Sequence, residues 1–420
     1  MKITDVRVTP VAVIDPPLLN VVGVHEPYAL RSIVEVDTDE GLTGLGETYG
    51  DTAMLEDLRR ARDVLIGQDP FHLQAIEASL AGRGRGSGKA LSLAPGTVAD
   101  RADTRLFAAV EVPCLDLQGK ALGRPVSDLL GGAVRERVPF AAYLFYKFAD
   151  HIDFDDYPPD EFGEVLSPDA VVREAQQFVS AYGFQSIKLK GGVLPPDREI
   201  ETMEALRAAF PEHPLRIDPN AAWTIDTAIE VAKRLDGVLE YLEDPAGGLE
   251  GMAKVAQSTD LPLATNMAVI GFSDLPESVH RDACQIILAD HHYWGGLQRS
   301  RELARICATW GLGLGMHSNS HLGISLAAMV HFGAAAPELP YAYDTHQPWQ
   351  ADDEVIVGGK LPIVDGAVAL PEGPGLGVEL DYDALARLHE RYEACGIRER
   401  DDVGQMRRYD AGWSGAIPRF

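Results

Sequence analysis

The chain has 420 residues, of which 46% are hydrophobic and 24% are charged, and its formal net charge is −27 at pH 7. This composition is typical of a globular protein with more than one domain, and the acidic charge argues against a nucleic-acid partner. No apolar run approaches the roughly 18 residues of a membrane span, so we expect no membrane partner.

The first third of the chain predicts a small α+β domain. Alternation of apolar and polar residues predicts strands at 3–14 and 29–48. Helical periodicity follows at 53–66, 70–81 and 105–122. We place this domain at residues 1–135, because strands followed by helices indicate an α+β unit.

Two glycine-rich stretches resemble nucleotide-binding loops without meeting their requirements. In GRGRGSGK at 82–89, Arg83 and Ala90 stand where a phosphate-binding loop needs Gly and Ser or Thr. The glycines at 41, 44 and 46 lie in a predicted hairpin rather than between a strand and a helix. We therefore expect a mobile loop at 82–89 and no nucleotide site in either stretch.

From residue 138 the pattern changes to short apolar runs separated by amphipathic helices. The runs are 138–145, 186–190, 215–220, 239–244, 261–266, 284–290, 311–317 and 341–346. Helices are expected at 168–182, 198–210 and 224–235, with Ser167 and Thr224 as N-caps. Eight strands alternating with helices predict a barrel of the (β/α)8 type at residues 136–365. The last segment, 366–420, is expected to pack back on the first domain through a helix at 381–395.

A polar or ionisable residue recurs near the C-terminal end of seven consecutive strands. These residues are Lys190, Asp218, Glu243, Asn266, Asp290, His317 and Asp344. One such residue is usually ordinary buried structure, but a series in phase indicates a site, because active sites of barrels assemble at this end of the strands.

Three of these residues are oxygen donors on adjacent strands. Asp218, Glu243 and Asn266 have the type and number of ligands that Mg²⁺ prefers. Zinc would instead need histidine or cysteine ligands. The weaker alternative metal site is a histidine cluster of His291, His292 and His321.

Two candidate bases flank this predicted metal site. Lys188 and Lys190 share one face of a strand, and each ammonium is expected to lower the pKa of the other, which makes a neutral amine available near pH 7. His317 comes from the seventh strand, with Asp290 placed to orient it. A Ser-His-Asp interpretation with Ser318 lacks the G-x-S-x-G turn. A metal between two bases is suited to removing a proton next to a carboxylate.

The motifs around these residues resemble the glucarate dehydratase subgroup of the enolase superfamily. They are KLKGG, IDPNAAW, LEDP, ATNM, LADHHYWGG and HSNSHLGIS, and outside the barrel core LLNVVGVHEP, AAYLFY, AYDTH and RERDD. The resemblance spans nearly the whole chain. It implies an α/β fold with a modified (β/α)7β barrel and an N-terminal α+β capping domain completed by the C-terminal segment.

The resemblance also implies roles for individual residues. Lys190 would be one general base, assisted by Lys188, and His317 with Asp290 would be the opposite base and the acid that helps to expel a hydroxyl group. The residues that would hold Mg²⁺ are Asp218, Glu243 and Asn266, with Glu250 as a weaker substitute for Glu243. The residues that would contact the substrate are His25, Tyr143, Asn220, Asn319, His346 and Arg400.

Two stretches depart from the subgroup pattern. The segment after LEDP is shortened, and ADTRLF at 102–107 replaces a threonine pair that follows an arginine. Both stretches border the expected substrate rather than the metal. The reaction class is therefore better supported than the identity of the substrate.

The expected activity is that of a hydro-lyase. We expect Mg²⁺-dependent dehydration of a diacid sugar, D-glucarate or L-idarate, to 5-keto-4-deoxyglucarate. The alternatives are a dehydratase of another aldaric acid, a diacid-sugar epimerase, and a non-catalytic protein that binds sugar acids. Expected partners are the small-molecule diacid sugar and other copies of the chain in a homo-oligomer. The four cysteines have no CxxC spacing, which favours reduced thiols and a cytoplasmic location.

Overall fold

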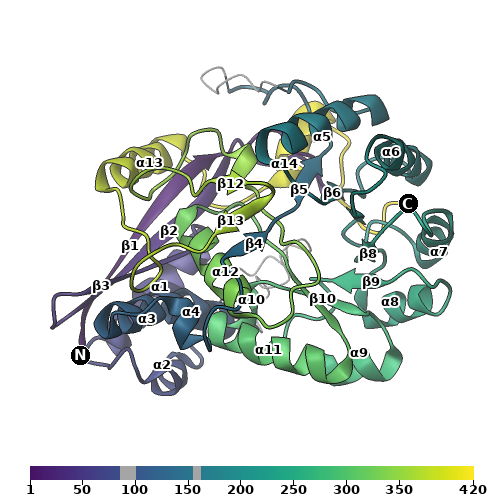
Figure 1. Cartoon of the computed structure of the whole chain (residues 1–420). Coiled ribbons are helices and arrows are strands. Elements are labelled where there is room, and N and C mark those ends of the chain that lie inside the picture. The colour runs from purple at the N-terminus through teal and green to yellow at the C-terminus, as the bar shows by residue number, and fades with distance from the viewer. Residues whose placement is uncertain (86–100, 155–161) are drawn as a thin grey trace.

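The computed structural model describes residues 1–85, 101–154 and 162–420. Within them an antiparallel sheet with its helices lies beside a larger parallel sheet that is covered by helices (Figure 1). This arrangement is the predicted one of an α+β capping domain beside an α/β barrel. Residues 86–89 of the glycine-rich stretch, where a mobile loop was expected, lie outside the described residues, as do residues 155–161.

The capping domain is built on a three-stranded meander. Its strands β1 (Ile3–Ile14), β2 (Tyr28–Thr38) and β3 (Thr43–Tyr49) pair in the order β1-β2-β3. The helices that follow are α1 (Thr52–Leu65), α2 (Leu73–Leu80), α3 (Ala102–Leu122) and α4 (Val126–Leu129). The predicted strands and helices of this domain are confirmed within a few residues at each end.

The glycines of β3 allow α3 to approach the sheet closely. A Cβ atom at Gly44 would lie 2.1 Å from the carbonyl oxygen of Pro113 on α3, and one at Gly46 would lie 2.7 Å from the Pro113 ring. A larger residue at either position would separate the helix from the strand. The glycine spacing in this hairpin therefore has a packing explanation.

Seven parallel strands form the barrel sheet. They are β5 (Ala142–Phe145), β6 (Ile187–Lys190), β7 (Leu215–Asp218), β8 (Tyr241–Glu243), β9 (Leu263–Thr265), β10 (Ile286–Ala289) and β11 (Gly313–Met316), in sequential order. The helices between and after them are α5 (Pro168–Tyr182), α6 (Pro196–Ala209), α7 (Ile225–Arg234), α8 (Gly248–Ala256), α9 (Leu275–Arg281), α10 (His291–Trp294), α11 (Leu297–Trp310) and α12 (Gly323–Ala335). Ser167 and Thr224 cap α5 and α7 through their side chains, as predicted.

The first and eighth predicted strands differ from the prediction. The run at 138–145 divides into β4 (Arg137–Pro139) and β5, because β4 pairs with β13 (Ala367–Ala369), which pairs with β12 (Ile363–Val364), in a separate small sheet. The run at 341–346 makes only a single bridge, between Phe140 and Tyr343. Asp344 N nevertheless donates to Met316 O of β11 at 2.9 Å. This segment therefore joins the last strand of the sheet to the first.

The C-terminal segment returns to the capping domain. Helix α13 (Tyr382–Cys395) packs on β1, where His389 Nδ1 lies 2.7 Å from Pro10 O and Arg391 Nη1 donates to Ala12 O at 3.2 Å. The sequence analysis missed α14 (Asp402–Tyr409) and η3 (Gln347–Trp349), which are too short for a clear periodic signal. The domain boundaries expected at residues 135 and 365 stay a prediction.

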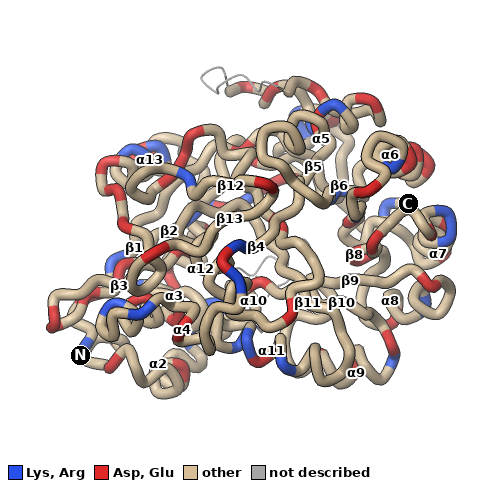
Figure 2. The backbone as a smooth tube through the Cα atoms, viewed as in Figure 1, with Lys and Arg blue, Asp and Glu red and all other residues tan. Residues whose placement is uncertain are grey.

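Charged residues are scattered over both parts of the described chain. Figure 2 shows Lys and Arg interspersed with Asp and Glu rather than gathered along one stripe. Asp and Glu number 64 against 37 Lys and Arg, so the surplus of charge is acidic. In the described ranges, no helix is both long and apolar enough to cross a membrane.

Candidate active site

The seven polar residues at the strand ends gather at one end of the parallel sheet. Each is buried, and each stands on or directly after strands β6 to β11 or in the segment that joins β11 to β5. Parallel strands bring their C-terminal ends to the same edge, which is why a recurrence in sequence becomes a cluster in space. The cluster therefore forms the floor of a common site.

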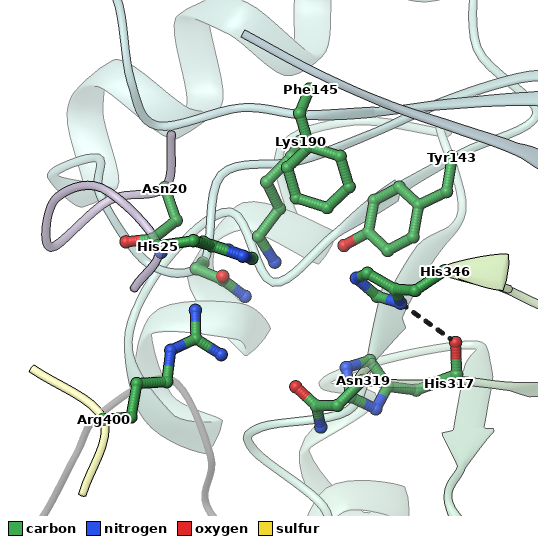
Figure 3. Close-up of a pocket in the computed structure, with 11 residues that line it drawn as sticks. Asn20, His25, Tyr143, Phe145, Lys190, His317, Asn319, His346 and Arg400 are labelled. Atoms are coloured by element: carbon green, nitrogen blue, oxygen red, sulfur yellow. Dashed lines mark hydrogen bonds between the residues drawn. The ribbon is translucent and has the colours of Figure 1, made fainter. Parts of the chain in front are cut away.

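A cavity opens above this floor (Figure 3). Its lining residues are Asn20, His25, Tyr143, Phe145, Lys190, Asn220, His317, Ser318, Asn319, His346 and Arg400. All six residues expected at the substrate are among them, together with the two expected bases. Sequence reasoning missed Asn20 and Phe145, although each lies within a motif that it used, and it considered Ser318 only for the Ser-His-Asp alternative.

The two lysines of β6 are held by carboxylates. Lys188 Nζ donates to Glu243 Oε1 at 2.8 Å and to Asp344 Oδ2 at 2.6 Å, and Lys190 Nζ donates to Asp218 Oδ2 at 2.6 Å. Burial alone lowers the pKa of Lys188, but the charges of Asp344 and Glu243 outweigh it and hold this pKa well above its ordinary value. The prediction that the paired ammonium groups lower each other's pKa is therefore wrong for Lys188, because carboxylates from distant strands reach it.

The donor set at the floor fits a divalent cation. Carboxylate oxygens of Asp218, Glu243 and Asp244 lie within 4.8 Å of one another. With Asp344, the buried carboxylates outnumber the two ammonium groups, and burial together with the Asp218 and Asp344 charges raises the pKa of Glu243 well above its ordinary value, although Lys188 opposes the rise. A buried excess of negative charge is costly unless a cation neutralises it. Carboxylate and amide oxygens are the ligands that Mg²⁺ prefers.

Asp244 is a member of this floor that the sequence analysis did not single out. Its carboxylate accepts hydrogen bonds from Thr265 Oγ1 and, at 2.8 Å, from Asn266 N. Burial and the nearby charge of Asp218 raise the pKa of Asp244 to about 7. Its position directly after Glu243 in LEDP was the available signal. The Asp244 carboxylate therefore fixes the backbone at Asn266.

Asn220 combines backbone strain with an unpaired polar atom. Its φ is +47° and that of Ala221 is +59°, which non-glycine residues rarely adopt outside functional sites. Its Nδ2 donates to Asp218 Oδ1 at 3.1 Å. Its Oδ1 is buried and has no hydrogen-bond partner among the described residues. Since this residue lines the cavity, that oxygen is placed to meet a ligand.

The opposite side of the cavity holds a carboxylate shared by two histidines. Asp290 Oδ2 lies 3.1 Å from His317 Nδ1, and Asp290 Oδ1 lies 2.8 Å from His292 Nδ1. Burial opposes ionisation of Asp290, but its interactions and hydrogen bonds with His292 and His317 outweigh burial and hold the pKa of Asp290 well below its ordinary value. Ser318 Oγ faces His346 Nδ1 at 3.3 Å rather than His317. This geometry does not support the Ser-His-Asp alternative.

The alternative histidine metal cluster also has an unsuitable neighbour. Arg31 Nη2 lies 3.2 Å from His292 Nε2, and a fixed guanidinium charge at this distance opposes a bound cation. Burial lowers the pKa of His321 to about 4. His321 Nε2 lies 3.2 Å from Thr345 Oγ1. The acidic floor is therefore the better metal site.

Segments from both ends of the chain complete the cavity. Figure 3 shows Asn20 and His25 entering from the N-terminal segment and Arg400 from the C-terminal one. His25 Nδ1 lies 3.0 Å from Asp15 Oδ2, while Arg400 donates twice to Asp402, at 2.7 and 2.6 Å. Both side chains are anchored before any ligand arrives. A histidine and an arginine on this wall suit an anionic ligand.

The orientation of the Asn319 amide is determined by two tyrosines. Asn319 Nδ2 donates to Tyr49 OH at 2.9 Å and to Tyr293 OH at 2.6 Å. An amide nitrogen has two hydrogens, so both are used. The Oδ1 atom is then the group left for the cavity, and it accepts from a donor such as a sugar hydroxyl.

Glu250 lies away from the site. It stands in the first turn of α8, its side chain is 72% exposed, and it pairs with Lys254 at 2.8 Å. Glu243 is fully buried at the floor. The structure therefore favours Glu243 over Glu250 as a ligand.

Comparison with known proteins yields matches over nearly the whole chain. Residues 3–131 match the family described as mandelate racemase / muconate lactonizing enzyme, N-terminal domain, and residues 170–384 match the family described as enolase C-terminal domain-like. A probable glucarate dehydratase of Streptomyces coelicolor is 47% identical, and the alignment covers 100% of this chain and 99% of that protein.

Solved structures are similar to the same extent. An enolase from Thermobispora bispora, complexed with magnesium and formate, is 56% identical with a TM-score of 0.97, and 100% of each chain is covered. An enolase from Pseudomonas fluorescens, with bound magnesium, potassium and tartrate, is 53% identical with a TM-score of 0.97, with 100% of this chain and 99% of that chain covered.

Proposed function

The chain belongs to the enolase superfamily and is glucarate dehydratase-like, and on this premise we propose that it is a Mg²⁺-dependent dehydratase of a diacid sugar. The substrate we propose is D-glucarate or its C5 epimer L-idarate, and the product is 5-keto-4-deoxyglucarate. The Streptomyces coelicolor relative carries the name of that activity. Tartrate, which is bound in the Pseudomonas fluorescens structure, is itself a diacid with hydroxyl groups next to its carboxylates.

The observation that carries the proposal is the placement of two bases on opposite sides of one cavity. Lys190 ends β6 and His317 follows β11, and four strands separate β6 from β11 in the sheet. Both side chains line the same cavity. A carbon held between them is open to proton transfer on either face, which suits substrates that differ in configuration at that carbon.

The chain's own residues then divide the reaction between them. Lys190 or His317 takes the C5 proton, according to the epimer, and the hydroxyl at C4 leaves as water with a proton from His317. The resulting enol gains a proton at C4 and loses the proton of its C5 hydroxyl, which gives the ketone at C5. Asp218, Glu243 and Asn266 would hold Mg²⁺, whose charge favours ionisation of a carbon next to a carboxylate.

The remaining cavity residues suit a diacid sugar. Arg400 and His25 stand near each other on one wall of the cavity, where they suit a carboxylate of the substrate. Asn319 presents an acceptor to hydroxyl groups. We further propose that the protein acts as a homo-oligomer in the cytoplasm. The homo-oligomeric state and the cytoplasmic location both stay predictions.

The test is an assay of a panel of hexaric and pentaric acids with Mg²⁺ in D₂O, read by keto-acid formation and by deuterium at the carbon next to the carboxylate. We expect keto acid from D-glucarate and L-idarate. His317→Asn should lower formation by about 10²- to 10⁴-fold, the usual contribution of a general acid or base.

Other outcomes separate the alternatives. Keto acid from a different diacid alone would keep the reaction and change the substrate. Deuterium exchange without elimination would indicate an epimerase. Binding of a diacid that raises the melting temperature without any exchange would indicate a non-catalytic sugar-acid binding protein. Undiminished turnover after replacing Lys190 and His317 together would contradict the assignment of the bases.

A further inference from the structure

A chain of polar contacts connects the capping domain to His317. Arg31 on β2 donates from Nε to Glu47 Oε1 on β3 at 2.8 Å, and its Nη2 lies 3.2 Å from His292 Nε2 in the barrel. His292 Nδ1 in turn lies 2.8 Å from Asp290, which holds His317. All five side chains are buried. Their contacts join residues that are as many as 261 positions apart in sequence.

The donors and acceptors in this chain determine where the protons are. A guanidinium donates only, so His292 Nε2 must accept from Arg31 and the proton of His292 must be on Nδ1. Nδ1–H then donates to Asp290 Oδ1. Asp290 Oδ2 accepts from Nδ1–H of His317, and this leaves His317 Nε2 without a proton.

The other groups near His292 Nε2 do not change this assignment of the protons. Ser325 Oγ lies 3.2 Å from His292 Nε2 and is able to donate to it, in agreement with Arg31. The carbonyl oxygen of Glu47 would favour a proton on Nε2, but it lies farther away, at 3.3 Å. The titratable and charged groups that face His292 are Arg31, Glu47, Tyr49, Asp290, His291 and His321.

Glu47 holds Arg31 and the segment after His317 in one arrangement. Its Oε1 also accepts from Leu322 N at 2.8 Å, and its Oε2 accepts from Ser325 N at 2.9 Å, at the start of α12. Burial opposes the charge of Glu47, but Arg31 and His321 outweigh burial and lower its pKa. Arg31 is therefore a fixed cation in a buried ion pair at the boundary between the two parts of the molecule.

We propose that Arg31 is a positioning residue for His317. It fixes the Nδ1–H tautomer of His292 and, through Asp290, keeps His317 Nε2 free to exchange a proton with the substrate. This inference rests on the proposed function, in which His317 serves one face of the substrate carbon and Lys190 serves the other. The contacts of Lys190 in this region are to Asp218 and not to the Arg31 chain.

The two faces provide the test. Deuterium exchange from D₂O is measured separately on D-glucarate and L-idarate for wild type, Arg31→Met and Arg31→Lys. We expect Arg31→Met to slow exchange at the face served by His317 by about 10- to 100-fold, the usual cost of losing a partner that orients a functional group. Exchange at the Lys190 face should change less than about 3-fold. Arg31→Lys keeps a charged donor and should recover most of the loss.

Two further variants separate positioning from folding. Arg7→Met removes a partly exposed arginine of the same sheet that pairs with Glu35 and does not line the cavity, and it should leave exchange at both faces of the substrate carbon unchanged. His292→Asn places an amide donor where Nδ1–H was and has no tautomers. When His292→Asn is already present, adding Arg31→Met should slow exchange at the His317 face by only about 3-fold or less. If Arg31→Met slowed exchange equally at both faces, or slowed it at neither face, the inference would be overturned.

The tautomer itself is measured without turnover. Long-range ¹H–¹⁵N spectra of the full-length protein labelled at histidine should show His292 and His317 protonated at Nδ1, and His292 should change to Nε2–H in Arg31→Met. An Nε2–H signal for His292 in wild type would overturn the inference. A wild type that exchanges neither epimer would contradict the proposed function alone, because this spectrum would still decide the role of Arg31.

Discussion

The two sides of the cavity are supported in different ways. On one side, Lys188 and Lys190 bind carboxylates that all come from barrel strands or from the segment closing the barrel. On the other side, Asp290 and His317 depend on contacts that continue through His292 to the capping domain. The lysine side is complete within the barrel, whereas the histidine side is shared between two parts of the molecule. Changes in the capping domain should therefore affect the two sides unequally.

The largest effect is expected on the lysine side, at Lys188. This side chain is fully buried between Glu243 and Asp344. Lys188→Met would leave both carboxylates buried without their cation, and breaking such a pair costs about 3–5 kcal/mol. We expect a correspondingly lower urea midpoint in EDTA and a smaller difference in Mg²⁺, because the metal would neutralise part of the same charge.

An exposed lysine provides the control for this variant. Lys254 pairs with Glu250 on the surface of α8, where both side chains are more than half exposed. Lys254→Met should change stability by less than about 1 kcal/mol, as exposed pairs do. If Lys188→Met were equally mild, the lysine side would not be held by the charges described above.

A smaller effect is expected where the capping domain reaches the substrate wall. Tyr293→Phe removes one of the two phenols that orient Asn319, while Tyr49 remains. The loss of one hydrogen bond costs about 1 kcal/mol. We therefore expect KM for the diacid to rise about 5-fold with little change in kcat, because Asn319 recognises a hydroxyl group rather than moving a proton.

Another tyrosine tests whether this effect is local. Tyr382 stands on α13, and Tyr382→Phe removes a hydroxyl that donates to Glu35 on β2, away from the cavity lining. It should leave KM unchanged. A fall in kcat for Tyr293→Phe at constant KM would instead mean that this contact serves the chemical step and not recognition.

The same contrast explains how much the sequence was able to predict. The lysine side follows from spacing alone, since strands that alternate with helices bring Lys190, Asp218 and Glu243 to one edge of a sheet. The barrel and the polar residues at its strand ends were predictable for this reason, whereas Tyr143, Asn319 and His346 were expected only from the family resemblance. Spacing does not show that Asp344 and Glu243 both reach Lys188, and the predicted pKa direction of Lys188 was therefore wrong.

On the histidine side, the pairing of His317 with Asp290 was predicted, but its continuation to the capping domain required the structure. Arg31 and His292 lie in different parts of the molecule, and no periodic pattern relates a residue on β2 to one after β10. Asp244 stood within a recognised motif and was still missed, because its partners, Thr265 and Asn266, follow 21 and 22 residues later. Contacts of this kind depend on how the elements pack, which the local sequence does not encode.

The smallest effect concerns the contact that holds the C-terminal segment against the capping domain. Glu26 accepts from Gln405 Nε2 at 2.5 Å and from Asp401 N at 3.2 Å, next to the cavity residue Arg400. Burial raises the pKa of Glu26 from 4.5 to about 7, and the charge of Asp402 adds to the rise. Below pH 4.5, the ordinary pKa of this carboxyl group, Glu26 is protonated in both the folded and the unfolded state. As pH rises toward 7, the folded state keeps a proton that the unfolded state has lost, so the stability contributed by this group decreases through that window.

Glu26→Gln removes this titration, because an amide stays neutral. The melting temperatures of wild type and Glu26→Gln should be similar near pH 4.5, and the variant should become the more stable of the two as pH rises to 8. Glu204→Gln, an exposed position on α6, should show no such divergence. If the melting temperatures of the two proteins stayed parallel from pH 4.5 to 8, Glu26 would be charged in the folded protein at neutral pH. The C-terminal segment would then be held through a charged carboxylate, as the histidine side is through Glu47 and Arg31. Divergence with the expected sign would instead mean that the capping domain contacts its two neighbours differently. It would contact the barrel through the charged Arg31 and the C-terminal segment through a neutral Glu26.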